Sequence, residues 1–143
     1  MAVVGLGCIS PRLQCSFYTE KLGLRSVREE ENYAVIDCGG VSLELIRSRL
    51  THPQELQFEV EGIDSAVAEL RSKGVEFEEI EIGMRQDGTF ATSLIGETYW
   101  GRYAVLHDPE GNSVMLAEHD ADWFPYMPGW FTEDAESHRQ TNG

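Results

Sequence analysis

The sequence predicts an α+β fold in which two tandem β-α-β-β-β units form one domain, and three observations lead to this prediction. The 143 residues fit the size of one ordinary domain that can bury a core of its own. A stretch of the first half recurs in the second half. In both copies the local signals run strand, capped helix and three strands, unlike the single alternation of strands and helices in doubly wound folds.

The repeat is clearest in two hairpins. Residues 33–36 read YAVI and residues 103–106 read YAVL, and each segment leads through a glycine-containing turn into a second apolar strand. Those second strands read SLEL and SVML, so that Glu44 corresponds to Met115. The repeat covers most of the chain. We therefore divide the domain, 1–143, into a first unit and a second unit, at 1–48 and 54–118.

The elements of the first unit follow from local signals. Residues 3–7 read as a short strand, and Ser10 with Pro11 reads as the cap and first position of a helix. Gly23 supplies the left-handed residue that commonly ends a helix. The three strands that follow are predicted at about 24–28, 33–37 and 42–47.

The second unit repeats this order. Residues 56–60 alternate as a strand, and Asp64 is expected to cap a helix that ends before Gly74. The next strands are predicted at about 76–82, 102–106 and 113–118.

Two segments lie outside the repeat. The matched glycines are 51 residues apart and the matched tyrosines 70, so the second unit carries 19 extra residues, placed as an inserted loop at 83–100. The loop suits either a cover over a cavity mouth or a plain surface loop. Residues 119–143 form an aromatic extension and a polar tail. The aromatic part is expected to pack on its own cavity or on a partner subunit, because so much apolar surface is costly in water.

Composition limits the possible partners. A formal net charge of −14 disfavours binding to nucleic acid and to anionic membrane surfaces. No apolar run is long enough to span a bilayer, and the first residues do not resemble a secretory signal, so the cytoplasm is the expected location. The three cysteines match neither a zinc module nor a disulfide framework.

Several short motifs together resemble the vicinal oxygen chelate superfamily, which includes glyoxalase I, extradiol dioxygenases and bleomycin-resistance proteins. The motifs are FYTEKLGL at 17–24, LEL at 43–45, FEV at 58–60, IDSA at 63–66 and DPEGN at 108–112. Each is weak alone, but their order and spacing are specific, and the resemblance covers residues 3–118. It implies that the two units form a cupped mixed sheet around one small-molecule site.

The resemblance also implies where metal ligands would stand. Metal-dependent members carry them at four equivalent positions, which here are occupied by Val3, Glu44, Glu55 and Met115. Only two of these side chains can bind a metal, and none is a histidine. We therefore expect no metal and no other cofactor. A shift in register that brings His52 or His119 to the cavity is the alternative.

The leading functional hypothesis is a small-molecule-binding protein that sequesters an aromatic or cationic compound, as bleomycin-resistance proteins do. The expected ligand-binding residues are Glu44, Glu55, Val3, Met115, Tyr99, Trp100, Tyr103 and Trp123. The alternative is a lyase, isomerase or dioxygenase of the same superfamily, for which no catalytic residue is assigned. A homodimer is expected, because strand edges and the aromatic extension need cover.

Overall fold

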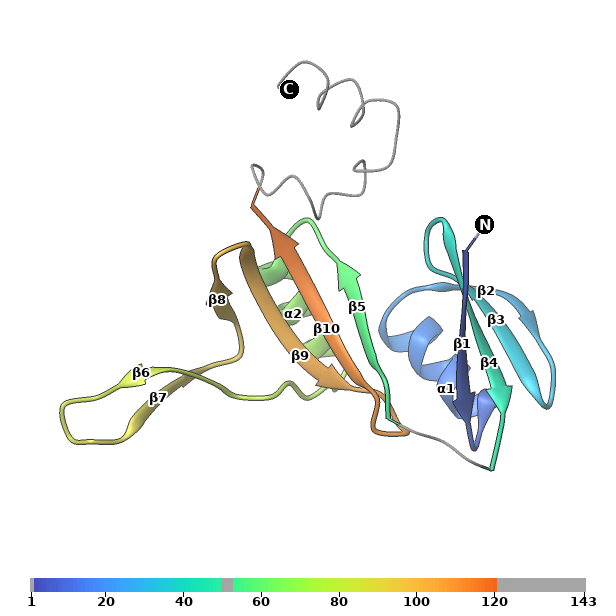
Figure 1. The fold of residues 1–143 in the computed structure, drawn as a ribbon, viewed down its shortest axis with the longest axis horizontal. Helices are drawn as coiled ribbons and strands as arrows, with labels where there is room; N and C mark the ends of the chain where they lie inside the picture. Colours follow the sequence, from blue (N-terminus) through green and yellow to red (C-terminus); the bar gives the residue numbers. More distant parts are fainter. Residues whose placement is uncertain (1, 50–52, 121–143) are drawn as a thin grey trace, which may run out of the picture.

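The computed structural model describes residues 2–49 and 53–120 (Figure 1). In the first unit, strand β1 (Ala2–Cys8) is followed by helix α1 (Pro11–Ser16), which continues as the wider helical turn η1 (Phe17–Lys21). The remaining strands are β2 (Arg25–Glu29), β3 (Tyr33–Asp37) and β4 (Val41–Arg47). The sheet has the order β1-β4-β3-β2, with β1 parallel to β4 and the other pairs antiparallel.

The second unit has the same plan. Strand β5 (Glu55–Glu59) leads to helix α2 (Ile63–Ser72), and the main hairpin is β9 (Gly101–His107) with β10 (Ser113–His119). The sheet has the order β5-β10-β9-β8, with β5 parallel to β10. This arrangement confirms the predicted α+β fold class and the duplicated unit. Among the described residues, no helix is long and apolar enough to cross a membrane.

The inserted segment has structure of its own. Strands β6 (Ile80–Met84) and β7 (Phe90–Ser93) form a two-stranded hairpin that stands away from the four-stranded sheets, and β8 (Gly96–Thr98) joins the edge of β9 (Figure 1). The strand predicted at 76–82 pairs with β9 only through an isolated bridge between Phe77 and Leu106. The edge of β9 is instead shared by two segments: Phe77 pairs near one end of β9, and β8 pairs near the other end.

The two helices begin in different ways. Ser10 caps α1 as predicted, because its Oγ accepts a hydrogen bond from the Leu13 amide with Pro11 at the first position. The predicted cap of α2 by Asp64 is wrong. The cap residue is Gly62, which has no side chain to offer, and the Ile63 amide donates instead to the Glu118 carboxylate on β10, 2.8 Å away.

The two units share one core and one buried polar centre. Asp108 lies in the β9–β10 turn, 5% exposed, and accepts hydrogen bonds from Tyr18 Oη at 2.7 Å and Gln14 Nε2 at 2.9 Å. Asn112 Nδ2 donates to the same carboxylate at 2.7 Å. Because Tyr18 and Gln14 belong to the first unit, this carboxylate joins the two units through bonds shielded from water.

Candidate functional site

Each four-stranded sheet has one face against its helix and one face turned away from it, which we call the cup face. In the first sheet, Leu6, Ala34 and Leu45 are paired neighbours on the helix face and are buried. Side chains alternate along a strand, so Glu44 lies on the cup face, in a row with Gly5 and Val35.

The cup face of the second sheet carries longer and more polar side chains. One row across β5, β10 and β9 consists of Gln57, Met115 and Val105. The next row consists of Glu59, Ala117 and Tyr103, and His119 lies beyond it opposite Gly101. Since β5 is parallel to β10, residues about 60 apart in sequence meet in these rows.

Four of these residues form what we call the aromatic cluster: Trp100, Tyr103, His119 and Glu59. The ring of Trp100 lies 4.7 Å from that of His119 at 32°, and 6.3 Å from that of Tyr103 at 45°. His119 Nδ1 lies 3.1 Å from Glu59 Oε1, and the His119 side chain is only 4% exposed. The indole therefore covers an imidazole that is held by a carboxylate.

Gly101 explains how this cluster can form. Its φ of 151° is unusual for residues with a side chain, and a Cβ there would overlap the backbone carbonyl of Glu118. Only glycine lets β9 approach β10 so closely at this point. Trp100 immediately precedes Gly101, which pairs with His119, and its ring lies against the His119 ring.

The structure does not place the predicted ligand-binding residues in one cavity. Glu44 is half-buried and lines a cavity of about 590 Å³ with Tyr33, Arg47 and Arg49, whereas Glu55 is exposed and lines a different groove. Val3 is 58% exposed and Tyr99 is 77% exposed. Met115, Trp100 and Tyr103 are half-buried on or beside the cup face of the second sheet. Trp123, with the rest of the aromatic extension, lies outside the described residues.

Glu59 was missed as a site residue, and His119 was considered only as a residue that a shift in register could bring to the cavity. The expectation that His119 follows the last strand is wrong, because β10 includes it and its side chain shares a face with Met115. The signal in the sequence that could have identified His119 is strand alternation, which puts residues 115, 117 and 119 on one face. His52 lies outside the described residues, and within those residues no group of three or more histidine, cysteine, aspartate or glutamate side chains is arranged to hold a metal ion.

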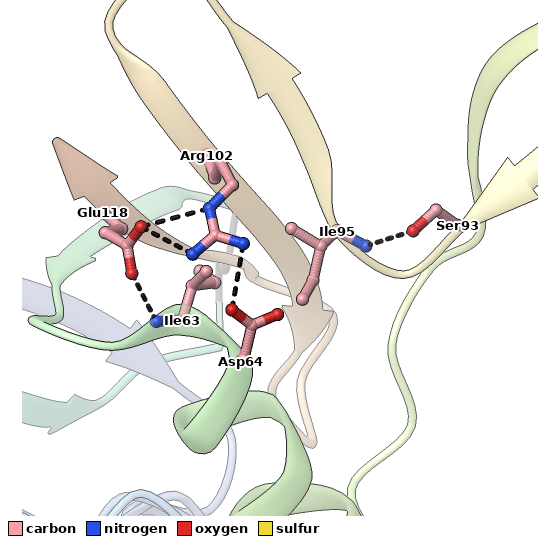
Figure 2. A network of polar contacts seen from close by, with 6 residues as sticks. All are labelled: Ile63, Asp64, Ser93, Ile95, Arg102 and Glu118. Atoms are coloured by element: carbon pink, nitrogen blue, oxygen red, sulfur yellow. Dashed lines mark hydrogen bonds and ion pairs between the residues drawn. The ribbon is translucent and has the colours of Figure 1, made fainter. Parts of the chain in front are cut away.

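A polar network supports the cluster from the helix side (Figure 2). Arg102 Nε and Nη2 donate to Glu118 Oε1 at 3.1 and 2.8 Å, and its Nη1 lies 3.0 Å from Asp64 Oδ2. The hydrogen bond from the Ile63 amide, and then those from Arg102, hold the pKa of Glu118 below its usual value. Glu118 and Arg102 adjoin His119 and Tyr103 in sequence, so the network fixes the backbone that carries the cluster.

Comparison with known proteins gives one family and many similar folds. The family model described as Glyoxalase/Bleomycin resistance protein/Dioxygenase superfamily matches residues 10–116. No curated protein sequence matches the chain.

Three solved structures illustrate the range of similar folds. The antibiotic-binding protein TnmS3 from Streptomyces sp. CB03234 has a TM-score of 0.65 at 18% identity, covering 84% of this chain and 95% of that one. The bleomycin-binding protein of Streptomyces verticillus, complexed with copper(II)-bleomycin, has a TM-score of 0.59 at 21% identity, covering 83% of this chain and 95% of that one. Lactoylglutathione lyase from Agrobacterium tumefaciens has a TM-score of 0.61 at 14% identity, covering 82% of this chain and 92% of that one. At these identities the similarity concerns the fold.

Proposed function

Because the chain belongs to the glyoxalase/bleomycin resistance protein/dioxygenase superfamily, we propose that it binds and sequesters a planar, cationic aromatic compound without using a metal. The observation that carries this proposal is the aromatic cluster on the cup face, in which the ring of Trp100 lies against those of Tyr103 and His119 and the Glu59 carboxylate lies beside His119. The location we propose is the cytoplasm.

The chemistry of the cluster suits a flat cation. An indole face attracts both aromatic rings and positive charge, and each such contact contributes about 1 kcal/mol once water is excluded. Glu44 adds a carboxylate on the cup face of the other sheet. The net charge of −14 favours the approach of cations over anions. A neutral aromatic compound of the same shape gains the stacking but not the charge pairing.

We propose further that the protein is a homodimer and that the site is completed between two chains. The cavity lined by Glu44 contains no described residue of the second sheet. If the cup face of one chain's first sheet meets that of the other chain's second sheet, Glu44 and the aromatic cluster enclose one ligand. Such a dimer is symmetric and contains two identical sites.

One observation favours catalysis as the second candidate. The contact between His119 Nδ1 and Glu59 Oε1 is the arrangement by which a carboxylate orients an imidazole for proton transfer. A lyase or isomerase that moves a proton on a small metabolite is therefore the alternative function. Turnover that is lost in His119→Gln and in Glu59→Gln, with ligand binding retained, would establish it.

The proposed binding function is tested by fluorescence titration of the purified chain with 9-aminoacridine, a cation at neutral pH, and with acridine, its neutral analogue. We expect saturable quenching of tryptophan emission and tighter binding of the cation. Glu44→Gln is expected to weaken the cation about tenfold, or about 1.4 kcal/mol, and the neutral compound much less. Glu31→Gln, at an exposed site of the same unit, is the matched control.

Two outcomes count against the proposal. If Glu44→Gln weakens binding of both compounds equally, this carboxylate does not distinguish a cation from a neutral ligand. If neither compound quenches tryptophan emission, the aromatic cluster is not a binding site for such compounds. For the metal, elemental analysis that finds about one equivalent per chain, lost in Glu44→Ala, contradicts metal-free binding.

A further inference from the structure

A second cavity lies between the two units, mainly on the helix side of the sheets, and reaches the edge strand β5. This inter-unit groove has a volume of about 800 Å³, within the range of small-molecule sites. Its lining residues come from β5, α2 and β10 of the second unit and from the first sheet and the end of η1 of the first unit.

The lining of the groove is mainly apolar. From the first unit come Val4, Leu22, Leu24, Val41 and Leu43, and from the second come Leu56, Phe58, Val60, Ala66, Leu70 and Leu116. Val4 is 43% exposed although it pairs with buried Leu43 on the helix face of its sheet. The two units therefore leave apolar side chains uncovered along their junction, where an aliphatic chain gains by leaving water.

Two cations meet at this groove. Lys21 and Lys73 are the only lysines in the sequence, 52 residues apart, and both line the groove. Lys21 Nζ donates to the Lys73 carbonyl at 2.5 Å, and Lys73 Nζ donates to the Lys21 carbonyl at 3.4 Å. Three carboxylates, those of Glu55, Glu59 and Glu69, also line the groove, so the charge left on the lysines depends on which of these acids pair with them.

The charge of these lysines is only partly neutralised. Lys73 Nζ lies 3.7 Å from Glu69, but Lys21 has no carboxylate partner within salt-bridge distance among the described residues. Of the other acidic residues that line the groove, Glu59 bonds His119, and Glu55 points to the cup face of β5. An ammonium group with donors to spare thus stands beside an apolar channel.

We propose that the inter-unit groove binds an amphiphile with an aliphatic chain and a carboxylate head, the chain lying along the apolar lining and the head pairing with Lys21 and Lys73. The ligand carries the opposite charge to the compound proposed for the cup. The two sites meet at β5, where Glu59 belongs to the aromatic cluster and also borders the groove. This inference does not depend on the proposed function.

The test is isothermal titration of the full chain with decanoate, decylammonium and decanol, all below their micellar concentrations. We expect decanoate to bind at least tenfold more tightly than decylammonium, and affinity to rise about fourfold for each methylene added to the carboxylate. Lys21→Gln is expected to weaken decanoate about tenfold, because it removes a charge-assisted hydrogen bond. Arg12→Gln, an exposed cation of α1 outside the groove, is the matched control and should change little.

A second pair of variants tests the apolar part. Ala66 lines the groove from α2, whereas Ala68 is exposed on the same helix and lies outside it. Ala66→Glu should abolish decanoate binding and Ala68→Glu should leave it unchanged, with urea midpoints recorded to confirm that both variants fold. Glu44→Gln should also leave it unchanged, which separates this site from the cup.

Three results overturn the proposal: decylammonium binding as tightly as decanoate, equal effects of Lys21→Gln and Arg12→Gln, or no decanoate binding to the full chain. None of these results bears on binding of 9-aminoacridine at the cup.

Discussion

Replacing Glu118 by glutamine tests how helix α2 is held at its first turn. One carboxylate oxygen accepts the Ile63 amide at 2.8 Å and the other accepts two hydrogen bonds from Arg102 (Figure 2). Glutamine keeps the volume but removes the charge, and its amide nitrogen cannot accept a hydrogen bond. The helix then loses either its cap or its connection to Arg102.

The magnitude follows from the capping bond. Loss of a side-chain cap costs about 0.5–2 kcal/mol, and the Glu118 side chain is 23% exposed, so we expect the free energy of unfolding to fall by about 1–2 kcal/mol. Urea unfolding at pH 7, followed by circular dichroism, measures this change. Glu76 is exposed, lies in the same unit and forms no ion pair with another described residue, so Glu76→Gln is the matched control and should lie within about 0.5 kcal/mol of the unchanged protein.

The effect should depend on pH in one direction. The folded-state pKa of Glu118 is held below its ordinary value of 4.5, so its stabilisation is complete above that value and is lost as the pH falls through the lower folded-state pKa. The difference between Glu118→Gln and the unchanged protein should therefore shrink below about pH 4. A difference that is the same at pH 3.5 and pH 7, or one matched by Glu76→Gln, refutes this reasoning.

Two further predictions concern buried groups. Tyr18→Phe should lower the free energy of unfolding by about 2 kcal/mol in urea titrations, because it removes a buried donor to the Asp108 carboxylate, and an unchanged midpoint would show that this bond is not needed to join the units. Burial, as the main cause, raises the pKa of Cys8 to about 11 and that of Cys15 to about 12 from an ordinary 9.0. Both thiols should therefore react with Ellman's reagent at pH 8 at least about a hundredfold more slowly than in urea, and equal rates in the two conditions would contradict the burial.

The fold was predictable because its signals are local and repeated. The YAVI and YAVL strands, their glycine turns and the Ser10–Pro11 helix start all act within a few residues. The cap of α2 was not predictable in this way, because its acceptor, Glu118, stands 55 residues from Ile63 and reaches it only through the packing of β10. Asp64 has the right residue type, but its carboxylate instead lies 3.0 Å from Arg102.

The candidate site shows the same division. Alternation along the strands correctly indicates which residues share a face with Glu44 or Met115. The partnership of Glu59 with His119 depends on the parallel register of β5 and β10 and on the end of β10 at His119. The inter-unit groove depends on how two whole units pack together, which no local pattern contains.

The central claim is that Glu44 of one chain and Trp100 of another enclose the same ligand. Mixing is the direct test, because Glu44→Gln chains and Trp100→Phe chains are each expected to bind 9-aminoacridine weakly alone. After the two are unfolded and refolded together, half of the dimers hold one chain of each kind, and one of the two sites in such a dimer is intact. We predict that tight binding returns to about a quarter of the sites. If the mixture binds no more tightly than its components, the site does not form between chains and the account is wrong.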